Sequence, residues 1–414
     1  MEKDILLKVR NYGPLRQGTD SLEDGFLRVP KYTIFIGDQG TGKSTLAKLL
    51  STFSWAEKSF VRRNNDPSTF TVDKLQTLFA NQNLPMGYIT ENTELEFRGQ
   101  VYTISVSRKK VKVLFRGDSS YVCPQIMYFP SERNILSVMD NPWEAKGLPE
   151  MVYQLATEYQ NAMKRRGRRR FQLFDGYSMQ FDPDTRTSYV LDPEGSVKIP
   201  LHEASSGLQS LAPLVVVSDY LAKEIGADFL DKLKRETISI RGEAIERMKD
   251  DALKAKVQTF FSSGLRDHLD CKDVEHLRTI LGKYVNSCLW QVVEEPEQNL
   301  YPVSQMKMVD RLIENTGNGG KLVMTTHSPY VLSILNNYIF AFDRYRKFGK
   351  TVRGVSLNHM MDFDAVAAYK MQDGGITTIK DSQSRMIDAT RIDECSQSIN
   401  EVFDRLMDMG ESPQ

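Results

Sequence analysis

The stretch GDQGTGKST at residues 37–45 directly follows the apolar run YTIFI at residues 32–36. It fits the pattern G-x-x-x-x-G-K-[ST], with a buried strand expected before it and a helix expected after it. Glycines let such a loop curl so that successive N–H groups face phosphate oxygens, and the helix N-terminus adds partial positive charge. We predict that these residues bind a nucleoside triphosphate: Gly37, Asp38, Gln39, Gly40, Thr41, Gly42, Lys43, Ser44 and Thr45.

Two residues of this stretch have separate expected roles. Lys43 would reach the β- and γ-phosphates as a point charge, and the Ser44 hydroxyl would ligate Mg²⁺. A Gly-rich turn between a strand and a helix that binds nothing is the alternative. All fixed positions of the pattern are filled and both flanks are correct, which favours the phosphate site.

The composition narrows the class of protein. A chain of 414 residues usually exceeds one hydrophobic core, so we expect two lobes or one domain with large insertions. The 54 basic and 54 acidic residues cancel, so net charge neither favours nor excludes nucleic acid. The four cysteines form no CxxC pair, which fits a reducing compartment and argues against structural zinc. With no apolar signal region or bilayer-spanning stretch, we expect a cytoplasmic protein without a membrane partner.

Apolar runs and turn residues predict the order of elements. Strands are expected at residues 5–10, within 26–36, and at 126–129, 288–293 and 321–325, with a meander at 95–115 and hairpins at 171–200. Helices are expected from residue 45 to about 58, across 135–166 with an interruption, and at 208–221, 222–286 and 396–409.

The segment CLWQVVEEP at residues 288–296 is an apolar strand that ends in two carboxylates. In a phosphoryl-transfer site, the first carboxylate supports Mg²⁺ and the second polarises the attacking water. We assign these roles to Glu294 and Glu295 in that order. The alternative is an acidic loop after a core strand, which the phosphate-binding loop in the same chain makes less attractive.

Two further segments carry weaker signals. Ser205, Ser206 and Gly207 lie just before an apolar helix, where hydroxyl groups and glycine can bind an anion, although Ser-Ser-Gly is also an ordinary N-cap. A third apolar strand delivers His327 at its carboxyl end, the edge where open α/β sheets bind ligands. A single histidine can equally be structural.

In this order, the motifs resemble the ABC-type ATPase heads of the RecF/SMC/Rad50 superfamily. The resemblance is strongest to the bacterial AAA-like ATPases of overcoming-lysogenization-defect, Septu and PARIS-type anti-phage systems. It rests on FPSER (129–133), ASSGLQSL (204–211), EEPEQNLYP (294–302), TTHSPYVL (325–332), VAAYKMQDGG (366–375) and FDRLM (403–407). It implies an α/β, ABC-type P-loop NTPase head over residues 1–414, with a mixed sheet, an antiparallel meander, helical insertions at 134–170 and 222–286, and no long coiled coil.

The same resemblance implies ATP hydrolysis with ATP and Mg²⁺ in two composite sites of a head-to-head dimer or a larger even-numbered assembly. Residues 299–302 would join the two sites across the interface. Ser205, Ser206 and Gly207 of one protomer would cover the γ-phosphate bound by the other. The residues acting from that other protomer would be Lys43, Ser44, Glu294, Glu295 and the switch residue His327.

The chain departs from the superfamily at three places. Glu294 stands where Asp is usual, and residues 204–207 read ASSG rather than Leu-Ser-Gly-Gly. No glutamine follows the strand at 126–129, and Ser131, Glu132 and Arg133 stand there instead. We expect Arg133 to make a polar contact at this position.

The remaining chain offers a basic run and an insertion. The run at Lys164, Arg165, Arg166, Arg168, Arg169 and Arg170 could follow nucleic-acid phosphates, or it could be a solvated surface or meet an acidic partner. Residues 222–286 are expected to dock a protein. Because no nuclease signature is found, any nuclease would be a separately encoded effector. Two functions stay open: an ATP-driven motor or sensor in anti-phage defence or RecF-like DNA maintenance, and an ATP-locked scaffold that sequesters an effector.

Overall fold

A six-stranded sheet organises the chain in the computed structural model, which describes residues 4–62, 64–117, 121–139, 144–236, 242, 245–246, 248, 250–264 and 269–389. Strands from β14 to β7 are parallel, and β15 is antiparallel to β14. The order across the sheet is β15 (Gly375–Thr378), β14 (Val366–Gln372), β3 (Tyr32–Gly37), β13 (Lys321–Thr325), β12 (Cys288–Glu294) and β7 (Pro124–Phe129).

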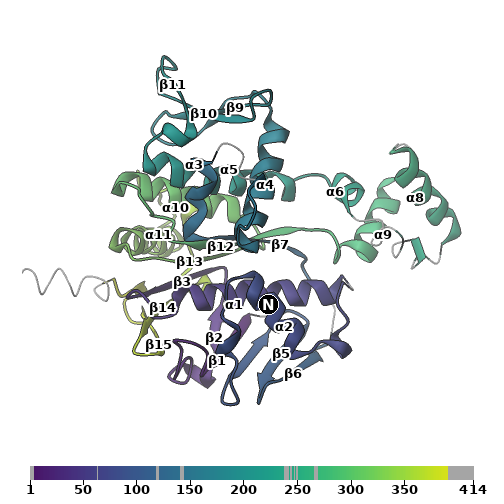
Figure 1. The fold of residues 1–414 in the computed structure, drawn as a ribbon, viewed down its shortest axis with the longest axis vertical. Coiled ribbons are helices and arrows are strands. Elements are labelled where there is room, and N and C mark those ends of the chain that lie inside the picture. Colours follow the sequence, from purple (N-terminus) through teal and green to yellow (C-terminus); the bar gives the residue numbers. More distant parts are fainter. Residues whose placement is uncertain are drawn as a thin grey trace, which may run out of the picture.

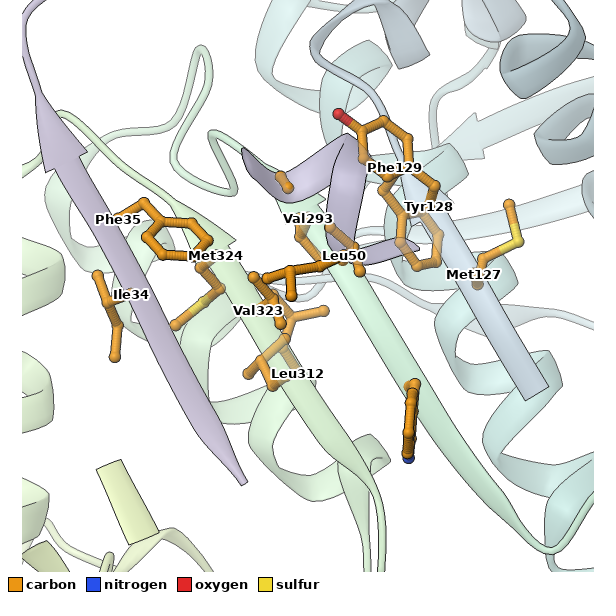
Figure 2. Close-up of a cluster of buried hydrophobic side chains, with 14 of the residues drawn as sticks. Ile34, Phe35, Leu50, Met127, Tyr128, Phe129, Val293, Leu312, Val323 and Met324 are labelled. Atoms are coloured by element: carbon orange, nitrogen blue, oxygen red, sulfur yellow. The ribbon is translucent and has the colours of Figure 1, made fainter. Parts of the chain in front are cut away.

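The central strands are apolar because helices cover both faces of this sheet. Every residue of β12 and of β13 is buried, the pattern expected of parallel strands enclosed on both sides. Side chains from four strands and two helices interdigitate there, as Figure 2 shows for Phe35, Met324, Val293 and Phe129 with Leu50.

One long helix lies between the central sheet and a second, antiparallel sheet (Figure 1). This helix, α1 (Lys43–Val61), contacts β3, β13, β12 and β7. The second sheet has the order β2 (Leu27–Val29), β1 (Ile5–Arg10), β4 (Glu94–Arg98), β5 (Tyr102–Ser107) and β6 (Lys110–Phe115), and α2 (Val72–Asn81) packs beside α1. The predicted meander is confirmed by the β4–β5–β6 pairing.

The other face of the central sheet carries the remaining helices of the body (Figure 1). They are α3 (Ile135–Val138), α4 (Glu150–Arg166), α5 (Ser206–Ile225), α10 (Pro302–Thr316) and α11 (Pro329–Phe348). The buried helix predicted at 208–221 is confirmed as α5. The region expected to be one interrupted helix at 135–166 forms α3, which ends at Val138, and α4, which begins at Glu150 after Pro149.

Two smaller units complete the described chain. The hairpins form a sheet of β8 (Phe171–Gln172), β9 (Ser178–Asp182), β10 (Thr187–Leu191) and β11 (Lys198–Pro200), and a short ribbon pairs β16 (Lys380–Asp381) with β17 (Met386–Ile387). We call the described residues between 227 and 286 the arm, because they project from the body in Figure 1. The arm contains α6 (Phe229–Arg235), α8 (Asp251–Ser263) and α9 (Cys271–Leu281) around a small apolar cluster of its own.

The predicted fold class is confirmed in its architecture, an α/β chain with a mixed sheet and an antiparallel meander. Within the described residues, the longest helices have 20 residues, so none forms a long coiled coil. None of the described helices is long and apolar enough to cross a membrane. The helix expected at 396–409, the FDRLM motif and Cys395 lie outside the described residues.

Glu57 joins α1 to the antiparallel sheet. Its buried carboxylate accepts hydrogen bonds from the N–H groups of Gln100, Val101 and Tyr102 at 3.1, 2.8 and 2.9 Å. Burial raises the pKa of Glu57, and the three N–H donors oppose this effect by stabilising the charged form.

We expect Glu57→Ala to lower the free energy of unfolding by about 3 kcal/mol, because it leaves three N–H groups unpaired in the interior. Glu57→Gln has a side chain of similar shape that keeps one carbonyl oxygen as an acceptor, so it should lower the free energy of unfolding by less. Urea unfolding of the two variants beside the native chain checks the order. An alanine variant as stable as the glutamine variant would contradict it.

Candidate functional site

Three neighbouring parallel strands deliver the candidate residues to one edge of the central sheet. β3 leads into the loop at 37–42, β13 into residues 326–327, and β12 into residues 294–295. The strand register places Thr325 beside both Phe35 and Glu294. Because the carboxyl ends of parallel strands meet at one edge, segments almost 300 residues apart become neighbours.

The loop at 37–42 is held in a conformation that requires glycine at its start. Gly37 has φ +142°, and a Cβ built on it would lie 2.4 Å from the carbonyl oxygen of Met371 on β14. Lys43, the first residue of α1, is buried and donates from Nζ to the carbonyls of Gly37 and Asp38 at 2.8 and 2.7 Å. The ammonium therefore lies inside the loop rather than in solvent.

Burial lowers the pKa of Lys43, while Glu295, Asp38 and Glu294 oppose the shift through their charges. The next residue, Ser44, is exposed in the first turn of α1, where main-chain N–H groups have no partner within the helix. A cation beside free helix N–H groups is the electrostatic setting that phosphate requires.

Glu294 ends β12 as a buried carboxylate with two fixed contacts. The Tyr128 hydroxyl donates to one oxygen, and the Ser131 N–H donates to the other at 3.2 Å. Burial, followed by the charge of Glu294, raises the pKa of Tyr128 well above its ordinary value, so the phenol stays protonated and remains a donor. The orientation of Glu294 is thus set by β7 and the turn after it.

Glu295 and His327 face each other across the edge, with 3.7 Å between Oε1 and Nε2. Glu295 has φ +43°, a left-handed backbone conformation that costs a non-glycine residue on the order of 1–3 kcal/mol. Its N–H donates to the Thr325 carbonyl at 2.9 Å, which helps to hold that conformation. Burial, followed by the charge of Lys43, lowers the pKa of His327, so its imidazole is neutral near pH 7.

Arg133 is the centre of this arrangement, although it is fully buried. Its guanidinium donates to the carbonyls of Glu294 and Glu295 at 2.7 Å each, and to those of Pro130 and Ser210 at 3.2 Å. Burial lowers its pKa to about 10, which leaves it charged near pH 7. The polar contact expected of Arg133 is present, and its partners are main-chain carbonyls of the protein itself.

Glu297 is a site residue for which the sequence suggested no role. Its Oε1 accepts from the Thr326 hydroxyl and from the His327 N–H, both at 2.7 Å. Its Oε2 is shielded from solvent and has no hydrogen-bond partner among the described residues. The sequence did contain one sign of this residue, since Glu297 is the third carboxylate of the EEPE motif. The structure shows its use, because Glu297 accepts hydrogen bonds from the loop that carries His327.

The predicted signature residues lie on the other side of the sheet from α1. Ser205 and Ser206 are exposed at the start of α5. A Cβ on Gly207 would lie 2.9 Å from the Asn299 carbonyl, and Asn299 Nδ2 donates to the Ser210 hydroxyl at 2.8 Å. The start of α5 therefore packs against the loop after β12, and α1 and α5 cover opposite faces of the sheet (Figure 1).

The basic run forms the last turn of α4 and the segment leading to β8. Part of its charge is neutralised within the chain. Arg165 lies 3.8 Å from Glu224, and Arg168 pairs with Asp182 and Asp184. The other cations of the run, Lys164, Arg166, Arg169 and Arg170, form no ion pair with a carboxylate among the described residues.

Comparisons with known proteins give partial matches. Residues 290–333 match a family model described as AAA domain, putative AbiEii toxin, Type IV TA system. The SMC head domain from Thermotoga maritima is 10% identical, with a TM-score of 0.35, over 91% of this chain and 98% of that chain. An SmcHead bound to the C-winged helix domain of ScpA is 11% identical, with a TM-score of 0.37, over 92% and 98%. No curated protein matches.

The site's donor set fits Mg²⁺ and a nucleotide. Mg²⁺ prefers oxygen ligands and is usually held by one or two protein groups together with phosphates. Ser44 and Glu294 are the oxygen donors that the sequence assigns to it, and Lys43 and the loop at 37–42 would hold phosphates. Within the described ranges, no group of three or more His, Cys, Asp or Glu side chains forms a metal cage, which this mode of binding does not need.

We expect Arg133→Met to lower the free energy of unfolding by about 3–5 kcal/mol, because four carbonyls lose a buried charged donor. Glu132→Ala, an exposed neighbour in the same turn, should change it by less than about 0.5 kcal/mol. Urea unfolding measures both. Equal effects of the two substitutions would show that Arg133 does not hold the turn and β12 together.

Glu297 should make stability depend on pH. Burial raises its pKa in the folded chain, so the folded state retains this proton where the unfolded chain has lost it. The stabilisation is complete below the ordinary glutamate pKa and is lost as pH rises through the folded-state pKa.

We expect Glu297→Gln, which keeps an acceptor for Thr326 and His327, to lose less stability than the native chain as the pH rises above the ordinary glutamate pKa of about 4.3. Urea unfolding at several pH values, with EDTA and no nucleotide, measures this difference. Glu132→Gln is the control, because Glu132 is exposed. Parallel pH profiles of Glu297→Gln and the native chain would refute the assignment.

Proposed function

We propose that this protein is an ATPase that binds and hydrolyses Mg-ATP between two copies of the chain. The observation that carries the proposal is the convergence of the Lys43 loop, Glu294, Glu295 and His327 at one edge of the sheet. Each group has the chemistry needed for a different part of phosphoryl transfer.

The proposed roles follow from charge and contacts. Lys43 binds the β- and γ-phosphates, and Ser44 with Glu294 holds Mg²⁺, which neutralises phosphate charge when bound. Glu295 is half-exposed and accepts a proton from the attacking water, whereas Glu294 is buried and its two donors fix its orientation while leaving lone pairs for Mg²⁺. The neutral His327 lies 3.7 Å from Glu295 and donates a hydrogen bond toward the γ-phosphate position.

A second copy would complete the site. Ser205 and Ser206 are exposed on the opposite layer from Lys43, where they can bind the phosphate of a partner protomer. Tyr301 and Tyr330 are 76% and 53% exposed beside the two catalytic loops, and large exposed aromatic side chains are typical of interfaces. We propose a head-to-head dimer, or a larger even-numbered assembly, closed by ATP.

We propose further that opening and closing of this dimer controls a separately encoded effector, with anti-phage defence as the setting. The family model that matches residues 290–333 names a toxin–antitoxin system, which is compatible with such a role. The arm, which has its own apolar cluster and projects from the body, is the proposed docking surface for the effector.

We expect Glu295→Gln to bind ATP and to dimerise with it. Its rate of ATP hydrolysis should fall by a factor of about 100 or more, because the general base is lost. Light scattering with and without Mg-ATP, beside ATPase rates, measures both properties. Glu132→Gln, a neutralised exposed carboxylate in a nearby turn, should behave like the native chain.

The outcomes separate the candidate functions. A monomer with no turnover in the native chain would overturn the composite-site ATPase. Full effector control by a Glu295→Gln protein that still dimerises would replace the motor with an ATP-locked scaffold.

A further inference from the structure

A cavity of about 400 Å³ lies where the end of α4 meets the last turns of α5, at the root of the arm. Its wall contains five cationic side chains and one carboxylate. The lining residues are Arg165, Arg166, Arg169, Arg170, Lys223, Glu224, Tyr220 and Ala227. None of the roles proposed above for ATP uses this cavity.

The positive charge of the cavity is largely uncompensated. Its one carboxylate, Glu224, already faces Arg165 at 3.8 Å and pairs with Arg235. Across the described chain, Arg166, Arg169, Arg170 and Lys223 have no carboxylate within ion-pair distance. Gathering like charges around a hollow is unfavourable unless an anion enters it.

Arg166 is already positioned to receive that anion. Its guanidinium lies 3.9 Å over the Phe171 ring, a cation–π contact that fixes the side chain. Burial lowers its pKa, and nearby Arg311 adds to this effect while Asp219 opposes it. A half-buried guanidinium without a bound carboxylate gains most from an incoming phosphate, because its hydration is already reduced.

A second cavity of about 310 Å³ shares the lining residue Ala227 with the first. It runs between the start of α6 and the end of α9, and it adds the cations Lys232 and Arg278 and the carboxylate of Asp228. The shared residue, Ala227, lies between the end of α5 and the start of α6. The cations of these two cavities, which we call the track, fit a ligand with phosphates repeated along its length.

We propose that this track binds a nucleic-acid strand, with strand phosphates in the cavity between α4 and α5. Arg166, Arg169 and Arg170 neutralise the phosphates, and the Tyr220 ring provides an aromatic surface for a base. Each cavity has the volume of a small-ligand pocket, which suits one or two nucleotides of a single strand better than a duplex. This inference does not depend on ATP hydrolysis.

The basic run supplies a matched pair of variants. Arg169→Ala with Arg170→Ala removes two cations from the cavity wall. Lys164→Ala with Arg168→Ala removes two cations from the same run but not from the cavity, which neither residue lines. Any generic effect of net charge is therefore the same in both variants. Thermal unfolding of each establishes that it is folded.

The test is fluorescence anisotropy of a labelled single-stranded oligonucleotide in EDTA, without nucleotide. We expect the variant with Arg169→Ala and Arg170→Ala to bind the oligonucleotide with an affinity lower by a factor of about 10 or more, because two charge-assisted contacts are lost. Its slope of log affinity against log salt should fall by about 1.5. The control pair should stay within about twofold of the native chain, because neither residue lines the cavity and Arg168 is already paired with Asp182 and Asp184.

Three results would overturn the proposal: no binding by the native chain, equal losses in both pairs, or full displacement of the oligonucleotide by an equal concentration of inorganic pyrophosphate. The last would assign the cavity to a small phosphate ligand. Because the phosphate-binding loop is intact in both pairs and no Mg²⁺ is present, failure here is separate from failure of the proposed ATPase.

Discussion

Four main-chain carbonyls share one buried guanidinium, and the geometry of the site depends on that contact. Arg133 connects the turn after β7, the end of β12 and the first turns of α5 through the carbonyls of Pro130, Glu294, Glu295 and Ser210. Main-chain carbonyls cannot move without their strands and helices. The guanidinium therefore fixes the relative positions of Glu294, Glu295 and the helix that begins at Ser206.

The carboxylates of Glu294, Glu295 and Glu297 differ in burial and in hydrogen-bond partners, because the surrounding strands and loops place each one differently. Glu294 is buried and accepts a hydrogen bond on each oxygen, from Tyr128 and from Ser131, so its position is fixed. Glu295 turns through a left-handed conformation, which directs its side chain to the half-exposed place opposite His327. Glu297 then binds the main chain of the His327 loop. The three carboxylates of this short motif thus have three different sets of contacts within the chain.

α5 joins the two ligand sites that we propose. Its first residues, Ser205 and Ser206, are exposed for a partner's nucleotide, and its last turns form a wall of the basic cavity through Tyr220, Lys223 and Glu224. A helix of 20 residues spans about 30 Å, and it is packed along most of its length. A rigid element with a ligand at each end can couple the two sites whenever it has two positions.

The sequence alone predicted the elements whose residues act locally. The glycines and Lys43 define the phosphate-binding loop, alternation of apolar residues defines the meander, and unbroken apolar runs define β12 and β13, because these signals arise within a few neighbouring residues. The assignments of Glu294, Glu295, His327 and the signature residues remain predictions, although the fold brings the first three to one edge. The sequence also predicted an interruption of the helical pattern at 135–166, and α3 ends at Val138 while α4 begins at Glu150.

Tertiary structure decided what depends on distant partners. The family pattern has a glutamine where Ser131, Glu132 and Arg133 stand in this chain. Nothing in the sequence FPSER shows that Arg133 would be surrounded by main-chain carbonyls, one of them from a residue 162 positions away. Likewise, the sequence of the basic run is compatible with a solvated surface, whereas the structure places part of the run beside α5 in the wall of a cavity. Sequence determines the chemistry each side chain brings, whereas burial and neighbours determine its use, because hydrogen bonds and charges act through space rather than along the chain.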